Sequence, residues 1–349
     1  MCDIGAAHVF IRAGKHGAIS NAENTMSKIL VTGSSGFIGT NMIEYLLKRG
    51  HTKLLGLDVH PPKVQDHRHL WTQCDLLDKE HLCRVVRDFG ATHIIHLAGR
   101  TDMEGKSVND YAANHIGTEN MVAVIRNAPS VEQVIFTSSQ FVVGPGKLPS
   151  SEFDFRPHTI YGQSKVLSEQ VIRKAELPCC WTIVRPTNVW GKWHPRYPYE
   201  FWRVLKQGRY FHPGGKGIIR SYAYIGNVIE QLYTILNSPP DKVNREVFYV
   251  GDAPIDLLDW TNAFSMGLVG KPVRVVPRSV VRAIAKVGDG IIAAGGKFPI
   301  FTSRYQSMTQ DYVTPMDKTF ERLGNPRIGL AEGIKETVSW LRSQGEFWR

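Results

Sequence analysis

The sequence predicts an α/β protein: a doubly wound parallel sheet followed by a smaller mixed α/β lobe. Between residues 27 and 186, short β-rich runs alternate with segments that have apolar residues at helical spacing. Such alternation is typical of βαβ units with helices on both faces of a sheet. After Pro186 the chain becomes rich in Gly, Pro, aromatic and basic residues, and the alternation stops. A length of 349 residues accommodates both parts.

The elements of the first part are expected from runs of apolar residues bounded by turn residues. Its strands are expected at Lys28–Thr32, Lys53–Val59, His93–Ala98, Gln133–Ser138 and Cys180–Arg185. Its helices are expected at Phe37–Arg49, His81–Asp88, Asn109–Asn127 and Ser164–Ala175. In the second part we expect strands at Glu246–Gly251 and Val273–Val276, and helices at Val228–Leu236, Leu257–Leu268, Ser279–Ala294 and Ala331–Ser343.

Three segments follow from this pattern. Residues 1–26 show no regular period and are expected to be a disordered extension ahead of the first strand. Residues 27–186 are expected to bind a dinucleotide, and residues 187–349 to form a substrate-binding lobe, with the chain crossing between the two.

Composition narrows the class of protein. The formal charge of +10 and pI of about 9.3 predict an anionic partner: a nucleic acid, an anionic membrane or a phosphorylated small molecule. No apolar run is long enough to span a bilayer, and Arg12, Lys15 and His16 interrupt any signal-peptide core. The five cysteines are scattered and have no metal-site spacing with histidine. We therefore expect a cytoplasmic protein without a bound metal or stable membrane insertion.

A glycine-rich turn separates the first strand from the first helix. Gly33, Gly36 and Gly39 have the spacing G-x-x-G-x-x-G, which gives a tight turn, close backbone approach and free amides at a helix N-terminus. A plain tight turn is the alternative. Asp58 ends the second strand, where a carboxylate accepts both ribose hydroxyls, which favours NAD over NADP. Asp75 is expected in a loop that reaches the adenine.

A second motif points to proton transfer. Tyr161 and Lys165 are four residues apart at the start of a helix, so both side chains lie on one face. A lysine cation beside a phenol predicts a pKa of Tyr161 lowered toward neutrality, which suits an acid/base catalyst. The run Ser138-Ser139 ends a strand at the same edge of the sheet and offers a hydroxyl to a substrate oxygen. The alternative is an exposed helix N-terminus with a solvated lysine.

These motifs together resemble one family. From about residue 27 to the C-terminus the chain is similar to the extended short-chain dehydrogenases/reductases, the NAD-dependent epimerase/dehydratase family, whose core is a Rossmann-type fold. The resemblance rests on TGSSGFIG (32–39), Asp58, Asp75-Leu76, HLAG (96–99), Asn114, FTSS (136–139), YGQSK (161–165), RPTNVWG (185–191), Tyr249-Val250-Gly251-Asp252 and the closing segment 323–341.

The resemblance implies roles for individual residues. It implies that Tyr161 is the acid/base, that Lys165 holds the nicotinamide ribose and that Ser139 orients the substrate. It assigns the NAD site to Gly33, Gly36, Phe37, Ile38, Gly39, Asp58, Asp75, Leu76, Leu97, Ala98, Gly99, Asn114 and Lys165, with Asn114 supporting the active-site helix. It also implies a homodimer formed through a four-helix bundle that includes the Tyr161 helix.

The chain departs from the family pattern at several positions. Ser139-Gln140 stands where sugar-nucleotide dehydratases usually carry an acidic pair, which argues against elimination of water. Val143 replaces the usual Tyr of V-Y-G, and Ser221, Gly226 and Asn227 replace usual aspartates. The substrate pocket is therefore expected to be unusual.

The basic charge is concentrated in the second part. Six Lys and Arg residues between Arg196 and Arg220 lie among aromatic residues, a mixture that suits a nucleotide diphosphate. By position, Asn188 and Arg220 resemble family residues that contact the substrate nucleotide and its phosphates, and Arg304 is a third candidate. No recognised nucleic-acid module is present.

The predicted function is NAD-dependent epimerisation or reduction of a nucleotide-diphosphate sugar. One alternative is a 3β-hydroxysteroid-type dehydrogenase, a member of the same extended family. It gains support from the helix Ser279–Ala294, whose basic face and opposite apolar face could cover an apolar ligand, lie on a membrane or form a solvated lid. A non-catalytic NAD-sensing module is the alternative from another class.

Overall fold

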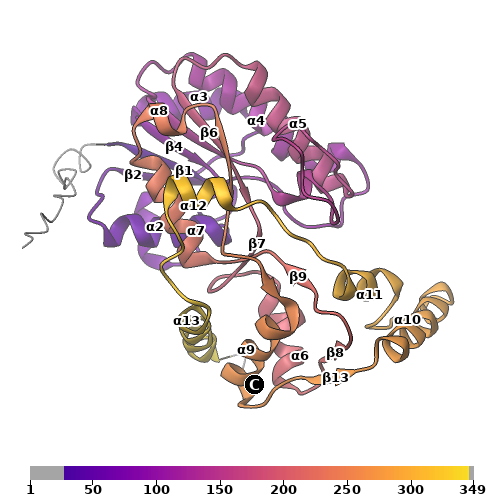
Figure 1. Cartoon of the computed structure of the whole chain (residues 1–349). Coiled ribbons are helices and arrows are strands. Elements are labelled where there is room, and N and C mark those ends of the chain that lie inside the picture. Colours follow the sequence, from indigo (N-terminus) through magenta and orange to yellow (C-terminus); the bar gives the residue numbers. More distant parts are fainter. Residues whose placement is uncertain (1–26, 346–349) are drawn as a thin grey trace, which may run out of the picture.

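The computed structural model describes residues 27–345, so the expected extension at 1–26 lies outside the described residues. A seven-stranded parallel sheet with helices on both faces forms the larger part of the molecule (Figure 1). The strand order is β11-β6-β5-β4-β1-β2-β3. The strands are β1 (Ile29–Thr32), β2 (Leu54–Asp58), β3 (Trp71–Gln73), β4 (His93–His96), β5 (Gln133–Thr137), β6 (Cys180–Pro186) and β11 (Glu246–Val250). The predicted Rossmann-type fold is confirmed.

Two hydrophobic layers hold helices against this sheet. In β1, Leu30 belongs to one layer, while Ile29 and Val31 belong to the other, as strand alternation requires. The first layer packs helices α3 (Lys79–Phe89), α4 (Ala112–Arg126) and α5 (Ile160–Lys174) on one face. The second packs α2 (Phe37–Lys48) and α7 (Ile225–Leu236) on the other. Strands buried on both faces explain why their sequences are continuous apolar runs.

The order of the strands reverses between β1 and β4, which flank each other although β2 and β3 lie between them in sequence. The loops that leave these two strands diverge to opposite sides, and a crevice opens at their carboxyl ends. The glycine-rich turn follows β1, and the segment Leu97–Gly99 follows β4. The motifs predicted to bind the cofactor therefore meet at one point of the sheet.

A smaller lobe lies below the carboxyl edge of the sheet (Figure 1). Its strand pairs are β7 (Asn188–Trp190) with β10 (Tyr222–Tyr224), β8 (Phe211–Pro213) with β13 (Arg274–Val276), and β9 (Ile219–Arg220) with β12 (Ile255–Asp256). Its helices include α6 (Arg203–Lys206), α9 (Leu257–Val269), α10 (Arg278–Ala293), α11 (Thr302–Thr309) and α13 (Leu330–Ser343). Buried aromatic rings, among them Trp190, Trp202, Trp260 and Phe264, form its centre.

The chain crosses between the two parts after Pro186. Helix α7 and strand β11 belong to residues 187–349, yet they pack on the central sheet, as does α12 (Asp317–Leu323) against β11. The short remaining elements are η1 (Gln65–Leu70), η2 (Val108–Tyr111), η3 (Gln140–Val142), the π-helical turn Pro198–Trp202 and α8 (Pro240–Val243). None of the helices between residues 27 and 345 has the length and hydropathy needed to cross a bilayer.

Candidate active site

The glycine-rich turn brings the backbone of two strand ends into contact. Gly33 has a φ of 69°, and a Cβ there would lie 2.7 Å from the backbone nitrogen of Ala98. A Cβ on Gly39 would lie 2.1 Å from the Gly33 carbonyl oxygen, so α2 can approach β1 only with glycine here. A Cβ on Gly36 would meet only the Gly33 oxygen, at 3.1 Å. The protein therefore restricts Gly36 less than Gly33 and Gly39, and Gly36 lines the cavity described next.

A cavity of about 830 Å³ lies at the carboxyl edge of the sheet and extends to the smaller lobe. Both parts of the chain line it, because Thr187–Val189 and His194–Tyr197 face the loops of the sheet. The cavity brings together most of the predicted site residues: Gly33, Gly36, Phe37, Ile38, Gly39, Asp58, Asp75, Leu76, Leu97, Ala98, Gly99, Ser139, Tyr161, Lys165 and Asn188.

The Asp58 carboxylate lies at the end of β2, next to the glycine-rich turn. One oxygen accepts a hydrogen bond from the Ser35 backbone nitrogen at 3.0 Å, and the other accepts from that of His60 at 3.0 Å. These two bonds fix the carboxylate toward the cavity that Asp58 lines. Burial lowers the pKa of the neighbouring Lys63, and the Asp58 charge acts in the opposite direction.

Tyr161, Lys165 and Ser139 meet at the start of α5. Thr159 caps this helix by accepting a hydrogen bond from the Gly162 backbone nitrogen at 3.0 Å, which places Tyr161 in the first turn. The Tyr161 hydroxyl is hydrogen-bonded with Ser139, and both residues are buried in the cavity wall. The Lys165 ammonium donates to the Thr137 carbonyl oxygen at 2.9 Å, at the end of β5.

The electrostatics of this group differ from the prediction. Burial raises the pKa of Tyr161 to about 12, while the bond with Ser139 and the charge of Arg196 act against that rise. Burial likewise lowers the pKa of Lys165 to about 8, opposed by the charge of Glu169. The predicted lowering of the Tyr161 pKa is thus wrong for this structure, because desolvation outweighs the nearby charges and the Lys165 ammonium points to a carbonyl oxygen.

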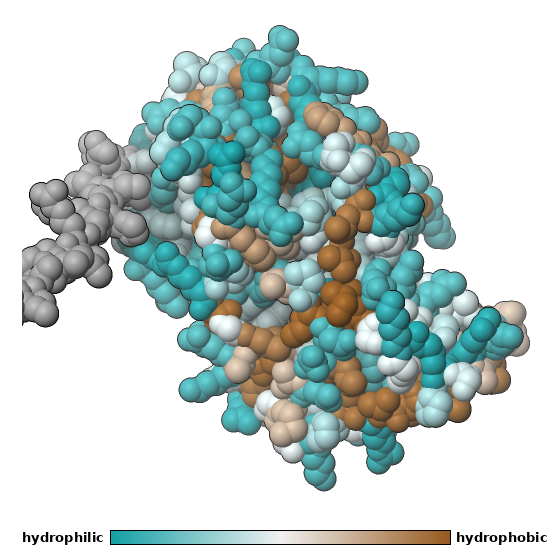
Figure 2. All heavy atoms as spheres, viewed as in Figure 1, coloured by the Kyte–Doolittle hydropathy of each residue, from teal (hydrophilic) through white to brown (hydrophobic). Residues whose placement is uncertain are grey.

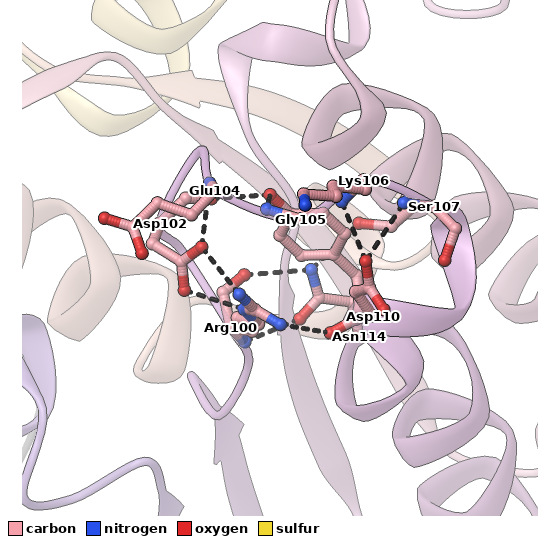
Figure 3. Close-up of polar contacts among 10 residues, drawn as sticks. Arg100, Asp102, Glu104, Gly105, Lys106, Ser107, Asp110 and Asn114 are labelled. Carbon is pink, nitrogen blue, oxygen red and sulfur yellow. Dashed lines mark hydrogen bonds and ion pairs between the residues drawn. The ribbon is translucent and has the colours of Figure 1, made fainter. Parts of the chain in front are cut away.

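Asn114 does not line the cavity but lies behind it. Its side-chain oxygen accepts from the Arg100 backbone nitrogen at 2.7 Å, and its amide donates to the Arg100 carbonyl oxygen at 3.0 Å (Figure 3). The same amide nitrogen donates to the Ser164 hydroxyl in α5 at 2.9 Å. Arg100 in turn pairs with Asp102 at 2.7 Å. Asn114 therefore joins the loop after β4 to the helix that carries Tyr161.

Two predicted substrate residues also lie outside the cavity wall. Arg220 donates to the Ser307 carbonyl oxygen, and its charge acts on Tyr197, which does line the cavity. Arg304 is exposed on α11 and donates to the Pro299 carbonyl oxygen at 3.1 Å. The structure thus brings Asn188 to the site and leaves the two arginines behind or away from it.

A buried ion pair under the site was not foreseen. Glu169 accepts from Arg185 through two nitrogens at 2.8 Å and from the Ser138 hydroxyl at 2.6 Å. Both charged side chains are almost fully buried, with exposed fractions of 0% and 1%. Arg185, a charged residue inside the apolar strand Cys180–Pro186, was the sequence signal from which a buried ion pair could have been predicted. The pair ties α5 and β6 to the end of β5, next to Ser139.

The cavity wall of the smaller lobe includes the start of the basic and aromatic segment expected from sequence, Arg196 and Tyr197, together with His194 and Pro195, which were missed. His194, Pro195, Arg196 and Tyr197 line the cavity in an irregular segment, whose position no sequence period indicates. The His194 ring stacks on Tyr197 and contacts the edge of Phe37 in the glycine-rich turn. Burial lowers the pKa of His194 to about 3, helped by the charge of Arg196, so its ring is neutral at physiological pH. The segment closes the cavity against α2.

Val143, at the position of the usual V-Y-G tyrosine, is contacted through its backbone by a tyrosine from elsewhere in the chain. The Tyr312 hydroxyl bonds the carbonyl oxygens of Val143 and Gln140, at 2.6 and 3.1 Å. Tyr312 follows α11, so this contact attaches the C-terminal segment to the loop after Ser139. Three residues that stand where the family usually has aspartates do not line the cavity: Ser221, Gly226 and Asn227.

Comparison with known families assigns the chain. The family model described as the NAD dependent epimerase/dehydratase family matches residues 29–251, which contain all seven strands of the central sheet. The chain belongs to this family. Members of the NAD dependent epimerase/dehydratase family are NAD-dependent enzymes. The matched residues include the turn after β1 and Asp58 at the end of β2.

Relatives within the family have several activities. N-acetyl-alpha-D-glucosaminyl-diphospho-ditrans,octacis-undecaprenol 4-epimerase of Escherichia coli O157:H7 is 29% identical over 58% of this chain and 61% of its own length, so the match covers less than two thirds of that relative. UDP-N-acetyl-alpha-D-glucosaminuronate decarboxylase of Bacillus cytotoxicus is 25% identical over 90% of this chain and 98% of its own. A 3 beta-hydroxysteroid dehydrogenase/Delta 5-->4-isomerase of Mycobacterium tuberculosis is 28% identical over 67% and 68%.

Solved structures show the same fold. UDP-glucose 4-epimerase of Thermotoga maritima, solved with UDP-glucose, superposes with a TM-score of 0.68 at 22% identity. The match covers 90% of this chain and 99% of the other. The smaller lobe is therefore part of the shared architecture and not an addition to it.

Proposed function

We propose that the protein transfers a hydride between NAD and a carbon of a nucleotide-diphosphate sugar, while Tyr161 moves the proton of the attached oxygen. The observation that carries the proposal is that one cavity contains both the Ser139–Tyr161–Lys165 group and the glycine-rich turn with Asp58. Oxidation or reduction at a C–O bond needs a proton-transfer group and a cofactor-binding site that lie no further apart than the length of the cofactor.

The cavity fits NAD. The exposed backbone of Gly36 in the cavity wall and the first amides of α2 suit a pyrophosphate, and the fixed Asp58 carboxylate suits the adenosine ribose. Asp75 and Leu76 lie at the adenine end, and Leu97–Gly99 and Lys165 continue toward the nicotinamide end. When bound, NAD supplies a carbon that accepts a hydride and returns it. A carboxylate rather than a cation at the end of β2 favours NAD over NADP.

Tyr161 and its neighbours handle the proton. A phenol with a pKa near 12 is neutral at physiological pH, so Tyr161 is ready to donate a proton to a carbonyl oxygen. The reverse step, removal of a proton from a hydroxyl, needs positive charge near the phenol, and Arg196 is the cation of the cavity wall whose charge acts on Tyr161. Lys165 lies four residues further along α5, with its ammonium on the Thr137 carbonyl oxygen. Ser139, hydrogen-bonded with Tyr161, holds the substrate oxygen between the two hydroxyls.

Epimerisation and one-way reduction of a keto-sugar use the same residues. Elimination of water needs a further acid and base, which Ser139-Gln140 does not supply. The sugar-nucleotide substrate is supported by the basic and aromatic segment Arg196–Arg220 and by relatives that act on UDP-sugars or a diphospho-linked sugar. We infer that Asn188 and Arg196 contact the substrate directly and that Arg220 acts through Tyr197.

A 3β-hydroxysteroid-type dehydrogenase is the second candidate. It is supported by the steroid-acting relative and by the position of Arg220 and Arg304 outside the cavity wall. A non-catalytic NAD sensor would need no buried phenol hydrogen-bonded with Ser139, so the cavity argues against it.

A thermal-shift screen of UDP-sugars, other nucleotide-sugars and 3β-hydroxysteroids, each with NAD and with NADP, tests the proposal. A ligand at 100 times its dissociation constant stabilises the folded state by about 2.7 kcal/mol. We expect stabilisation by NAD and, in its presence, by at least one nucleotide-sugar. If only steroids add to the effect of NAD, the second candidate is correct.

We also propose that the protein is a cytoplasmic homodimer that pairs through α4 and α5. Ile116 on α4 and Leu167 on α5 support the pairing, because both are large apolar side chains left exposed, at 39% and 37%.

A further inference from the structure

Helices α10 and α11 form an arm that projects from the smaller lobe (Figure 1). Along the whole of α10 only Val281, Ala285 and Gly288 are buried, and α11 has no buried residue. Gly288 lets the chain at Phe298 and Ile300 pack closely on the helix, since a Cβ there would lie 2.0 Å from the Ile300 carbonyl oxygen. The arm therefore has a defined fold while most of its surface faces outward.

One face of α10 is apolar and exposed. Val280, Val287 and Ile291 lie seven and four residues apart, so their side chains form one stripe along the helix. Their exposed fractions are 45%, 60% and 37%, and Val275 at the base of the arm is 54% exposed. Figure 2 shows apolar atoms interspersed with hydrophilic ones on this outer part of the smaller lobe. We call Val280, Val287 and Ile291 the apolar stripe.

The arm also carries much of the net positive charge. The arm and the segment just before it, residues 271–309, contain seven basic residues and one acidic residue, and five of the basic residues lie in the arm itself, in a chain whose formal net charge is +10. The acidic residue, Asp289, is bonded to the backbone nitrogen and hydroxyl of Thr302. Arg282 and Lys286 are exposed, and no carboxylate of the described residues forms an ion pair with either. The basic residues are Lys271, Arg274, Arg278, Arg282, Lys286, Lys297 and Arg304.

These two features identify the kind of surface that fits the arm. An apolar stripe on one face of a helix and basic residues on the opposite face form the pattern of a helix that lies in the plane of a bilayer surface. Anionic headgroups attract the basic residues, and the apolar stripe enters the layer between headgroups and acyl chains. A second copy of the chain would instead bring two sets of positive charges together, which disfavours self-association through this face.

We propose that the arm docks on an anionic lipid membrane, with the apolar stripe of α10 facing the acyl chains and Arg282 and Lys286 contacting the headgroups. The proposal goes beyond the chemistry proposed above and does not depend on it.

Two contacts connect the arm and the segment after it to the rest of the molecule on the side of the cavity. Arg220 donates to the Ser307 carbonyl oxygen near the end of α11. Three residues beyond that helix, the Tyr312 ring packs against the ring of Phe141, which lines the cavity. The arm is therefore connected through Tyr312 to a residue of the cavity wall.

Co-sedimentation of the full chain with phosphatidylglycerol/phosphatidylcholine vesicles tests the proposal, with pure phosphatidylcholine vesicles in parallel. We expect binding to the anionic vesicles that weakens with salt. Arg282→Gln with Lys286→Gln should reduce the partition coefficient roughly 30-fold, since each basic residue near the surface contributes about fivefold. Val280→Ser with Val287→Ser and Ile291→Ser should reduce it by about tenfold or more.

Matched variants provide the controls. Lys79→Gln with Arg84→Gln removes two exposed charges from α3, and Leu47→Ser, Leu148→Ser and Met266→Ser remove exposed apolar side chains elsewhere. These should bind vesicles like the wild type, and all variants should keep the thermal shift caused by NAD. The proposal is overturned by absence of wild-type binding, by equal binding to neutral vesicles, or by equal losses in the control variants. A smaller oligomer on loss of the apolar stripe, measured without vesicles, would instead assign that face to a second copy.

Discussion

At the scale of single residues, two glycines three positions apart have different reasons to be glycine. Gly39 is fixed by the protein itself, because a side chain would overlap the Gly33 carbonyl oxygen. At Gly36 a methyl group would press only on the Gly33 carbonyl oxygen, at 3.1 Å, which a small shift can relieve, and the residue faces the cavity. The spacing of the motif predicted a phosphate site, but only the geometry separates a residue needed for folding from one needed for binding.

A pair of alanine variants tests that distinction. Gly36→Ala should change the free energy of unfolding by less than about 1 kcal/mol, yet raise the dissociation constant of NAD about tenfold, because the methyl group occupies the approach to the pyrophosphate. Gly39→Ala should destabilise the protein by about 3 kcal/mol, since helix and strand must separate. Chemical denaturation and calorimetric titration measure both. Equal effects of the two variants on stability would contradict the assignment.

Lys165 makes stability depend on pH. Burial lowers its pKa to about 8 from 10.5, so between these values the unfolded chain binds more protons than the folded one. Stability from this residue must therefore rise with pH across that window. Relative to Lys165→Met, the wild-type free energy of unfolding should increase by roughly 2–3 kcal/mol between pH 7 and pH 10.

Urea denaturation of the two proteins at several pH values measures this difference. The comparison with Lys165→Met cancels the titration of cysteine and tyrosine residues common to both. A difference that stays constant over the range would show that Lys165 is not desolvated as the structure has it.

The side chains of the predicted catalytic group could be named from sequence, whereas their electrostatics could not. Tyr161 and Lys165 share a helix face, which spacing alone specifies. Their pKa values depend on how deeply α5 is buried and on where the ammonium points, and both are properties of packing between distant segments. Arg196 acts on Tyr161 from an irregular segment, so no period could have placed it there.

At the scale of elements, a buried ion pair holds the catalytic helix on the sheet. Glu169 in α5 and Arg185 in β6 join across the end of β5, and the Ser138 hydroxyl completes the contact. Glu169→Ala leaves the Arg185 guanidinium buried without its partner, so we expect a loss of about 3–5 kcal/mol in unfolding free energy. Thermal or chemical denaturation measures this loss.

The exposed pair Arg87–Asp88 is the matched control, because both side chains are 68% exposed. Asp88→Ala should cost less than about 0.5 kcal/mol. If Glu169→Ala behaves like Asp88→Ala, the buried pair does not hold α5 in place.

Most elements of the central sheet followed from apolar runs, with ends displaced by a few residues. Helix α5 begins at Ile160, four residues before its predicted start, because Thr159 supplies the cap. Strand β3 has only three residues, too few for a pattern. The lengths of α11 and α12, and the irregular segment after Trp190, depend on tertiary contacts that no local period records.

At the scale of the whole molecule, the sequence predicted the two parts better than their boundary. The strand Glu246–Gly251 was expected in the second part, and the structure adds it to the central sheet as β11, beside β6. A parallel strand can come from any distance along the chain, so its partner is not readable from its own residues. The division of the chain into two domains at residue 186 stays a prediction, and the chain returns to the central sheet after that residue.

The net charge likewise has two locations. The segment Arg196–Arg220 was expected to hold the phosphates of a small molecule, and Arg196 does line the cavity. The arm formed by α10 and α11 carries a second group of basic residues, away from the cavity wall. The two groups are consistent with two kinds of anionic partner.

The central claim is that Tyr161 moves the proton of a hydride transfer between NAD and a nucleotide-sugar. The most direct measurement mixes NAD-loaded enzyme with the nucleotide-sugar that gives the largest thermal shift, and follows the absorbance of the reduced cofactor in a single turnover. The account predicts that wild-type enzyme forms reduced cofactor and that Tyr161→Phe forms none while still binding NAD and sugar. Equal rates in the two proteins, or reduction only with a steroid, would contradict it.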